Sequence, residues 1–153
     1  MNELEELITL LGRDADENIR ADAAEMLGEI GGGRAVRALL AALNDPSGVV
    51  RVSAALALGE LRAEEACPAL MTALVDDAAN VRGAAAVALG QIGDWRAVLP
   101  LRTRATDEAP AVRGAVAWAL GALGDPQELT ALNAVASTYG LTGERYAKLK
   151  IRT

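Results

Sequence analysis

Apolar residues recur with a helical period along most of the chain. Residues 34–45 read RAVRALLAALND, with apolar side chains from Val36 to Leu43 at the i, i+3, i+4, i+7 spacing that marks one face of a helix. Residues 49–61 read VVRVSAALALGEL and are apolar over more of their circumference. Pro46 lies between the two segments and cannot continue the first helix, because it has no amide proton. The pattern predicts an antiparallel helical hairpin.

The hairpin pattern repeats without a gap, and it predicts the fold. Four ladders keep the same 31-residue spacing: Gly28, Gly59, Gly90, Gly121; Arg20, Arg51, Arg82, Arg113; Leu27, Leu58, Leu89, Leu120; Asp14, Asp45, Asp76, Asp107. We expect helices near 3–12, 18–29, 34–44, 49–60, 65–75, 80–91, 96–106, 111–122 and 127–138. A hairpin cannot bury its apolar face alone, so successive hairpins must stack.

The predicted fold class is therefore all-α, a right-handed α-solenoid of about 4.5 repeats. Residues 1–140 form one domain, and residues 141–153 form a degenerate C-terminal cap or a basic tail. Each glycine of the ladder costs about 1 kcal/mol of helix propensity relative to alanine. We expect close approach of neighbouring helix backbones to offset that loss.

The repeat resembles that of a known family. The motif VRxxAAxALGxIGDxRAVxxL is similar to the HEAT-like repeat of the phycobilisome-lyase type, and residues 81–101 read VRGAAAVALGQIGDWRAVLPL. Residues 19–40 are a second close copy, whereas Arg62 and Ala63 replace the Gly-Asp turn. The resemblance covers about residues 3–138. It implies the fold more narrowly than the function, because such repeats occur in bilin lyases, in enzyme-associated scaffolds and in engineered binding proteins.

Charge and composition narrow the class of partner. The net charge is −6, with 13 acids and 6 bases in residues 1–66 but one acid and four bases in residues 141–153. An acidic body disfavours nucleic acid, which is bound largely through phosphate neutralisation. No apolar run is long enough to span a membrane, and the acidic N-terminus is unlike a secretory signal. We expect a cytoplasmic protein that binds neither nucleic acid nor membrane.

The sequence offers little catalytic chemistry. It contains no histidine, which excludes Ser-His and Cys-His nucleophilic sites, and also the His–Glu di-iron sites that the resemblance associates with some relatives. Cys67 shares the register of Val36 and Val98 and is predicted to be a buried core residue rather than a reactive thiol. The glycines at 31–33 follow a helix and are predicted to end it rather than to hold phosphate. We expect no enzyme activity, no metal and no cofactor.

The arginine and aspartate ladders recur in every repeat, six residues apart across the turn. A binding site seldom needs four equal copies, so we expect exposed Asp–Arg contacts that stabilise the turns, each contributing about 0–1 kcal/mol. Ligand binding is the alternative.

Positions that vary between repeats are the better candidates for recognition. By resemblance, the second helix of each hairpin lines the concave face, and one register along it reads Glu25, Leu56, Val87, Trp118. The strip is acidic at its N-terminal end and apolar toward its C-terminal end, as expected of an interaction site. The predicted binding residues are Leu56, Val87, Trp118, Val52, Glu25, Glu29, Glu60 and Gln91.

Alternatives remain for the tryptophans and for the function. Trp118 could instead pack on the C-terminal cap as ordinary core, and Trp95, in the turn between repeats, is expected to pack locally. The leading hypothesis is a non-catalytic scaffold or adaptor that binds a protein or peptide on its concave face. By resemblance, the second is a bilin-lyase-like protein or lyase subunit that binds a linear tetrapyrrole or its acceptor protein. A third is self-association through the apolar strip.

Overall fold

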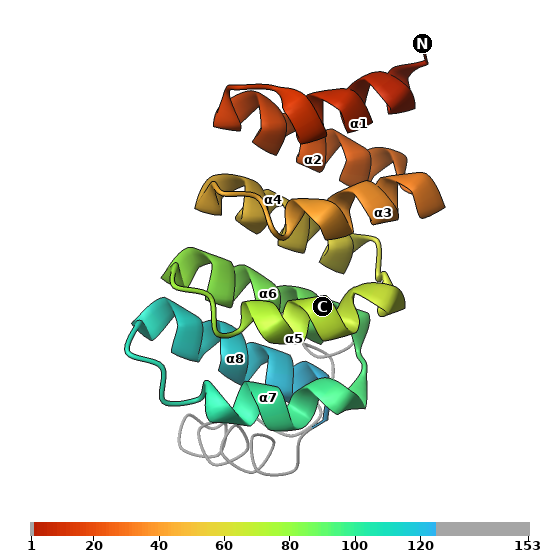
Figure 1. Ribbon diagram of the computed structural model, residues 1–153. Helices are drawn as coiled ribbons and strands as arrows, with labels where there is room; N and C mark the ends of the chain where they lie inside the picture. The colour runs from red at the N-terminus through yellow and green to blue at the C-terminus, as the bar shows by residue number, and fades with distance from the viewer. Residues whose placement is uncertain (1, 125–153) are drawn as a thin grey trace, which may run out of the picture.

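The computed structural model describes residues 2–124, which form stacked antiparallel hairpins (Figure 1). The helices are α1 (Glu3–Arg13), α2 (Glu17–Ile30), α3 (Gly33–Ala42), α4 (Gly48–Glu60), η1 (Glu64–Ala66), α5 (Cys67–Ala73), α6 (Ala79–Ile92), η2 (Trp95–Ala97), α7 (Val98–Thr103) and α8 (Pro110–Ala122). This part of the chain contains no strand. The all-α solenoid predicted from the repeat is confirmed. The predicted helix at 127–138 and the C-terminal cap or tail lie outside the described residues.

In two hairpins, the first helix differs from the prediction. The segments expected at 65–75 and 96–106 each begin with a 3-10 turn, η1 or η2, and their α-helices, α5 and α7, end early. Pro68 occupies the first turn of α5, where its missing amide proton removes no helical hydrogen bond. Pro100 lies at the third position of α7. The α-helices α5 and α7 therefore begin two residues later, and end two to three residues earlier, than the apolar pattern predicts.

Local chemistry fixes the helix ends. Asn2 caps α1 in a reciprocal capping box with Glu5, and the Asp16 side chain caps α2. Gly31, Gly93 and Gly124 follow the second helices with positive φ angles, as predicted for helix-ending glycines. In the same register stands Arg62, which adopts φ 50° and is the one non-glycine residue in the described part of the chain with a positive φ.

The second helices pack against each other in series. Figure 1 shows the hairpins stacked in chain order from α1–α2 at the top to α7–α8 at the bottom. The most extensive contacts join α2 to α4, α4 to α6, and α6 to α8. A leucine at the same register in each second helix is buried: Leu27, Leu58, Leu89, Leu120. Close spacing of these helices, compared with the first helices, places them on the inner side of the curved stack.

Glycine makes that close spacing sterically feasible. A Cβ atom built on Gly59 would lie 2.7 Å from the Ala88 Cα atom, and one on Gly90 would lie 2.9 Å from the Ala119 Cα atom. Both distances are below those that real Cβ atoms adopt against backbone. The close approach predicted from the glycine ladder is therefore confirmed, and any side chain at these positions would push the layers apart.

Within residues 2–124, no helix combines the length and the apolar composition needed to cross a bilayer.

Candidate functional site

The predicted binding residues lie together along the inner helices. Glu25 in α2, Leu56 in α4, Val87 in α6 and Trp118 in α8 occupy one register, one residue per layer, and we call them the central strip. Leu56 and Trp118 are each 37 % exposed, Val87 is half-buried and Glu25 is exposed. Their chain neighbours Ala57 and Leu58 are buried. Leu56, Val87 and Trp118 therefore present apolar surface that the packing between layers leaves partly exposed.

Four flanking residues differ in how available they are. Glu29 and Glu60 are exposed, and Val52 is half-buried. Gln91 is also half-buried, and its Oε1 atom lies over Gly59 of α4, shielded from solvent and without a hydrogen-bond partner in the described part of the chain. The Gln91 amide oxygen is thus packed between layers rather than directed to solvent.

Trp118 contacts the layer before it. The closest atom to a Cβ built on Gly90 is Cζ3 of the indole, at 2.6 Å, so part of the ring covers the α6 backbone at that glycine. The rest of the ring remains exposed. Gly83 and Gly114 have no atom within 4 Å of the Cβ position, which leaves open space one helical turn before Val87 and Trp118. Trp118 is neither fully buried core nor a free side chain.

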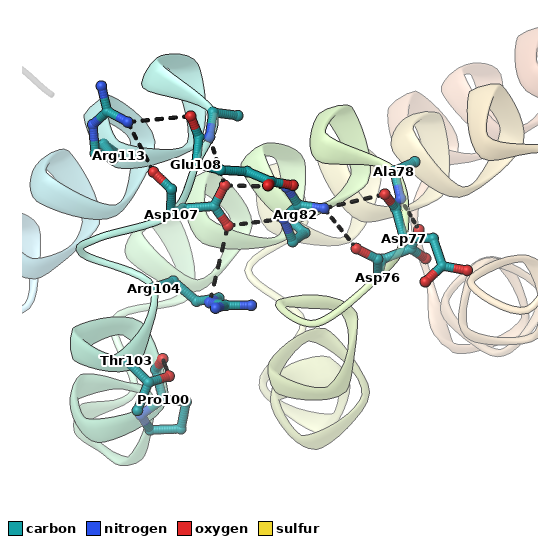
Figure 2. A network of polar contacts seen from close by, with 11 residues as sticks. Asp76, Asp77, Ala78, Arg82, Pro100, Thr103, Arg104, Asp107, Glu108 and Arg113 are labelled. Atoms are coloured by element: carbon teal, nitrogen blue, oxygen red, sulfur yellow. Dashed lines mark hydrogen bonds and ion pairs between the residues drawn. The ribbon is translucent and has the colours of Figure 1, made fainter.

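A second feature joins the layers along the edge formed by the turns. Three of the four ladder arginines, Arg20, Arg51 and Arg82, each pair with an aspartate 25 residues later, in the next repeat. Arg82 donates from Nε and Nη2 to the two carboxylate oxygens of Asp107, at 2.9 and 3.1 Å (Figure 2). Its Nη1 donates to the backbone oxygen of Asp76 at 2.8 Å. The equivalent pairs are Arg20–Asp45 and Arg51–Asp76.

The expected exposed contact between carboxylate and guanidinium six residues apart is therefore wrong. An arginine binds only the backbone carbonyl of the aspartate six residues before it, as Arg51 binds that of Asp45. The aspartate carboxylate instead accepts the amide proton of the residue two positions after it. For Asp45 the amide belongs to Ser47, at 2.8 Å. The pairs are shielded as well: the side chains of Arg82 and Asp107 are 8 % and 2 % exposed. The ladder stabilises the contact between layers as well as the turn.

The ladder shifts the ionisation of its members. The hydrogen bond from Arg82, together with the Ala109 amide, lowers the pKa of Asp107. Burial alone would raise the pKa values of Asp45 and Asp76, but hydrogen bonds from arginine and from backbone amides outweigh it, and both pKa values are lowered. These carboxylates are ionised in the folded protein at neutral pH.

The last step of the ladder borders a depression of about 410 Å³. Its lining includes Asp76, Arg82, Arg104 and Asp107, and Figure 2 shows the Arg82 guanidinium between the Asp107 carboxylate and the Asp76 backbone oxygen. Arg82 and Asp107 pair with each other, whereas Arg104 Nε lies 3.9 Å from Asp107 Oδ2 and has no hydrogen-bond partner within residues 2–124. The depression therefore lies where the ladder joins the last two described layers.

Cys67 is fully buried, as its register predicted. Burial raises the pKa of its thiol, and the nearby Asp94 carboxylate raises it further. Arg96 donates to Asp94 at 2.6 Å and lowers the pKa of that carboxyl group to about 2. Residues 2–124 contain no group of three His, Cys, Asp or Glu side chains placed to hold a metal ion.

One expectation about the surface is wrong, and one residue was missed. Trp95 does not pack locally but is 78 % exposed, because its register in η2 points outward, as the exposed equivalents Gly33 and Glu64 show. Leu99, one helical turn later, is 70 % exposed. The repeat could have shown the outward register of Trp95, but a tryptophan in a turn suggested packing instead.

Comparison with known proteins agrees with this geometry. A family model described as HEAT repeats matches residues 4–89 and 69–139. No curated protein matches the sequence.

Several solved structures share the fold. Human deoxyhypusine hydroxylase in complex with glycerol has a TM-score of 0.71 and 28 % identity, over 81 % of this chain and 44 % of that one. The complex of CpcE and CpcF of phycocyanin lyase from Nostoc sp. PCC7120 has a TM-score of 0.71 and 31 % identity, over 81 % of this chain and 54 % of that one. The crystal structure of an engineered protein has a TM-score of 0.60 and 25 % identity, over 80 % of this chain and 63 % of that one. The chain spans about half the length of the two natural proteins.

Proposed function

The chain belongs to the HEAT-repeat family, and from that premise we propose that it is a non-catalytic scaffold that binds a protein or peptide on its concave face. One observation carries the proposal. Leu56, Val87 and Trp118 form an apolar row on the inner helices, in a register that the stacking of layers does not require. Exposed apolar rows of this kind mark interaction surfaces.

Charge along the strip favours a particular class of ligand. Glu25, Glu29 and Glu60 are exposed at the N-terminal end, and the apolar side chains follow toward α8. A helix or extended peptide with basic residues at one end and aliphatic or aromatic residues at the other matches this order. Trp118 would be its main contact, because partly exposed tryptophans dominate binding energy at many interfaces.

Truncation of Trp118 tests the proposal. Full-length protein is used to select peptides from a displayed random library, and the affinity of the selected peptides is measured for Trp118→Ala and for Trp95→Ala. We expect the first variant to bind about 30-fold more weakly, which corresponds to about 2 kcal/mol. Trp95→Ala is the matched control, because Trp95 is exposed but lies outside the strip.

A second variant guards against loss of the fold, since the indole also packs on α6. Glu25→Lys changes an exposed side chain whose one given contact is a long hydrogen bond from Ser53 Oγ, at 3.4 Å, and it should weaken binding of peptides that carry a basic end. Equal affinities for wild type, Trp118→Ala and Glu25→Lys would contradict the proposal. Capture of a partner from native lysate by wild type and Trp95→Ala, but not by Trp118→Ala, would extend it to the natural ligand.

Similarity to the phycocyanin lyase chains supports a second candidate, a bilin-lyase-like protein or subunit that binds a linear tetrapyrrole or its acceptor. The half-exposed indole of Trp118 would then contact the pigment. Titration with phycocyanobilin, followed by pigment absorbance and tryptophan fluorescence, tests this candidate. An unchanged spectrum at high micromolar pigment would contradict it.

A further inference from the structure

The first layer exposes side chains whose equivalents are buried in later layers. Ile19 is 41 % exposed and Met26 is 43 % exposed, both in α2. The buried equivalents are Val50, Val81 and Val112 for Ile19, and Ala57, Ala88 and Ala119 for Met26. In later layers these positions lie against the second helix of the layer before, as Ala57 does against Gly28. The exposed side of α2 therefore carries the apolar residues that, in later layers, pack against the preceding layer.

The first helix shows the same difference. Leu4 and Ile8 in α1 are only half-buried. Their equivalents in the later first helices and turns are fully buried: Ala35, Ala66 and Ala97 for Leu4, and Leu39, Leu70 and Leu101 for Ile8. Both helices of the hairpin thus present apolar surface in the same direction.

Asp14 adds a polar group of defined geometry to this surface. Its Oδ1 atom accepts the Asp16 amide proton at 2.8 Å, just as Asp45 accepts that of Ser47. The turn therefore holds the Asp14 carboxylate as it holds those of the later ladder. Asp45, Asp76 and Asp107 each receive two hydrogen bonds from an arginine of the preceding layer. In the described part of the chain, Arg20 donates to the backbone oxygen of Asp14 at 2.8 Å, but no arginine donates to the Asp14 carboxylate.

Charge decides what can cover the surface. Residues 3–30 contain nine acidic and two basic side chains, so two copies of this face would repel each other. An arginine-bearing hairpin would be attracted and would complete the ladder. In this chain the ladder arginine precedes the ladder glycine by eight residues, as Arg20 precedes Gly28. The matching second helix therefore carries arginine and, eight residues on, glycine.

We propose that Asp14, Ile19, Met26, Leu4 and Ile8 form a stacking face that binds a helical hairpin of the same repeat type from a second polypeptide, with an arginine of that hairpin paired to Asp14. The surface is separate from the central strip and does not depend on the proposed peptide binding.

The chain supplies its own probe, because residues 34–64 contain a complete hairpin with Arg51 and Gly59 at the required spacing. A synthetic peptide of these residues is titrated into isotope-labelled full-length protein. We expect saturable amide shifts confined to α1 and α2, with a Kd below about 1 mM. The matched peptide with Arg51→Gln should bind at least about tenfold more weakly, and Asp14→Asn in the protein should abolish that difference.

A fused probe tests separately whether the face accepts a hairpin at all, apart from the affinity for a hairpin on a second chain. A second copy of residues 34–64, placed directly before Glu3, puts the copied Arg51 25 residues before Asp14. We expect hydrogen exchange in α2 to slow at least about tenfold, and Arg51→Gln in the copied hairpin alone to reverse most of the effect. Trp118→Ala should change neither result.

Three outcomes would overturn the proposal. If the fused hairpin exchanges like unfolded chain and α2 is unchanged, the surface does not accept a hairpin. If Arg51→Gln binds equally well, the arginine pair with Asp14 is absent. If the fused hairpin docks but the separate peptide does not bind at about 1 mM, the surface fits a hairpin only within one chain.

Discussion

At the scale of single residues, the glycine ladder sets the spacing of the layers. Glycine at these positions has no role in helix formation, since it weakens a helix relative to alanine. Its role is contact: Gly59 faces the Ala88 backbone of the next layer, and Gly90 faces Ala119. Gly83, also within α6, has no atom within 4 Å of its Cβ position. Glycine thus occurs in α4 against a neighbouring backbone and in α6 facing open space. Substitution by alanine at each position distinguishes the effect of packing from that of helix propensity.

Gly59→Ala should destabilise the protein by about 2 kcal/mol or more, because overpacking against backbone outweighs the gain in helix propensity. Gly83→Ala should stabilise it by about 0.5–1 kcal/mol, since only the propensity changes. Chemical denaturation of the two variants measures both effects. Stabilisation by Gly59→Ala would show that the layers can separate without loss.

Arg62 is strained where its equivalents are glycine. It adopts φ 50°, in a register filled elsewhere by Gly31, Gly93 and Gly124. A side chain in this left-handed region costs about 1–2 kcal/mol relative to glycine. Arg62→Gly should therefore raise the free energy of unfolding by about 1 kcal/mol, part of the gain being lost to the greater freedom of glycine in the unfolded chain. An unchanged or lower denaturation midpoint would contradict this reasoning.

At the scale of helices and turns, the sequence revealed which residues recur but not which of them meet. The period located Arg51 and Asp76 and showed that both are structural. It favoured partners six residues apart, because those lie in one turn. The structure pairs residues 25 apart instead, since the cap on Ala78 orients the Asp76 carboxylate toward the previous layer. Contacts between layers depend on three-dimensional stacking, which a linear period does not specify.

Two adjacent carboxylates test the contribution of the ladder. Asp76 accepts hydrogen bonds from Arg51 and from the Ala78 amide, whereas Asp77 is exposed and its side chain makes no hydrogen bond within residues 2–124. Asp76→Asn should lower the free energy of unfolding by about 1–3 kcal/mol, because a shielded guanidinium loses its charged partner. Asp77→Asn should change it by less than about 0.5 kcal/mol. Equal effects in urea denaturation would contradict a structural role for the ladder.

At the scale of the whole molecule, the stack and its inner strip follow from the repeat with little additional information. Register alone identified Leu56 and Trp118 as side chains that the packing leaves partly exposed. It could not show that the Trp118 ring also covers Gly90, or that the Gln91 amide lies over Gly59, because both contacts cross layers. The exposed upper face of α2 was also missed, since the sequence shows the same apolar register whether or not a layer covers it.

The charge distribution of the stack predicts an unusual pH dependence. The chain has no histidine, so side-chain ionisation changes little between about pH 6 and pH 8. The pKa values of Asp45, Asp76 and Asp107 are lowered in the folded state. Below the unfolded value of about 4 the unfolded chain binds more protons, so folding stability falls as pH decreases through the lowered pKa values.

We therefore expect equal urea midpoints at pH 6 and pH 8 and a clear fall by pH 3, where the lowered carboxylates of the ladder lose part of their advantage. Asp76→Asn should fall less steeply in acid than wild type, because one of the linked groups has been removed. The Asp77→Asn variant should follow the wild-type curve. A midpoint that changes between pH 6 and pH 8, or an acid slope that Asp76→Asn leaves intact, would show that stability is linked to other groups than the arginine–aspartate pairs between layers.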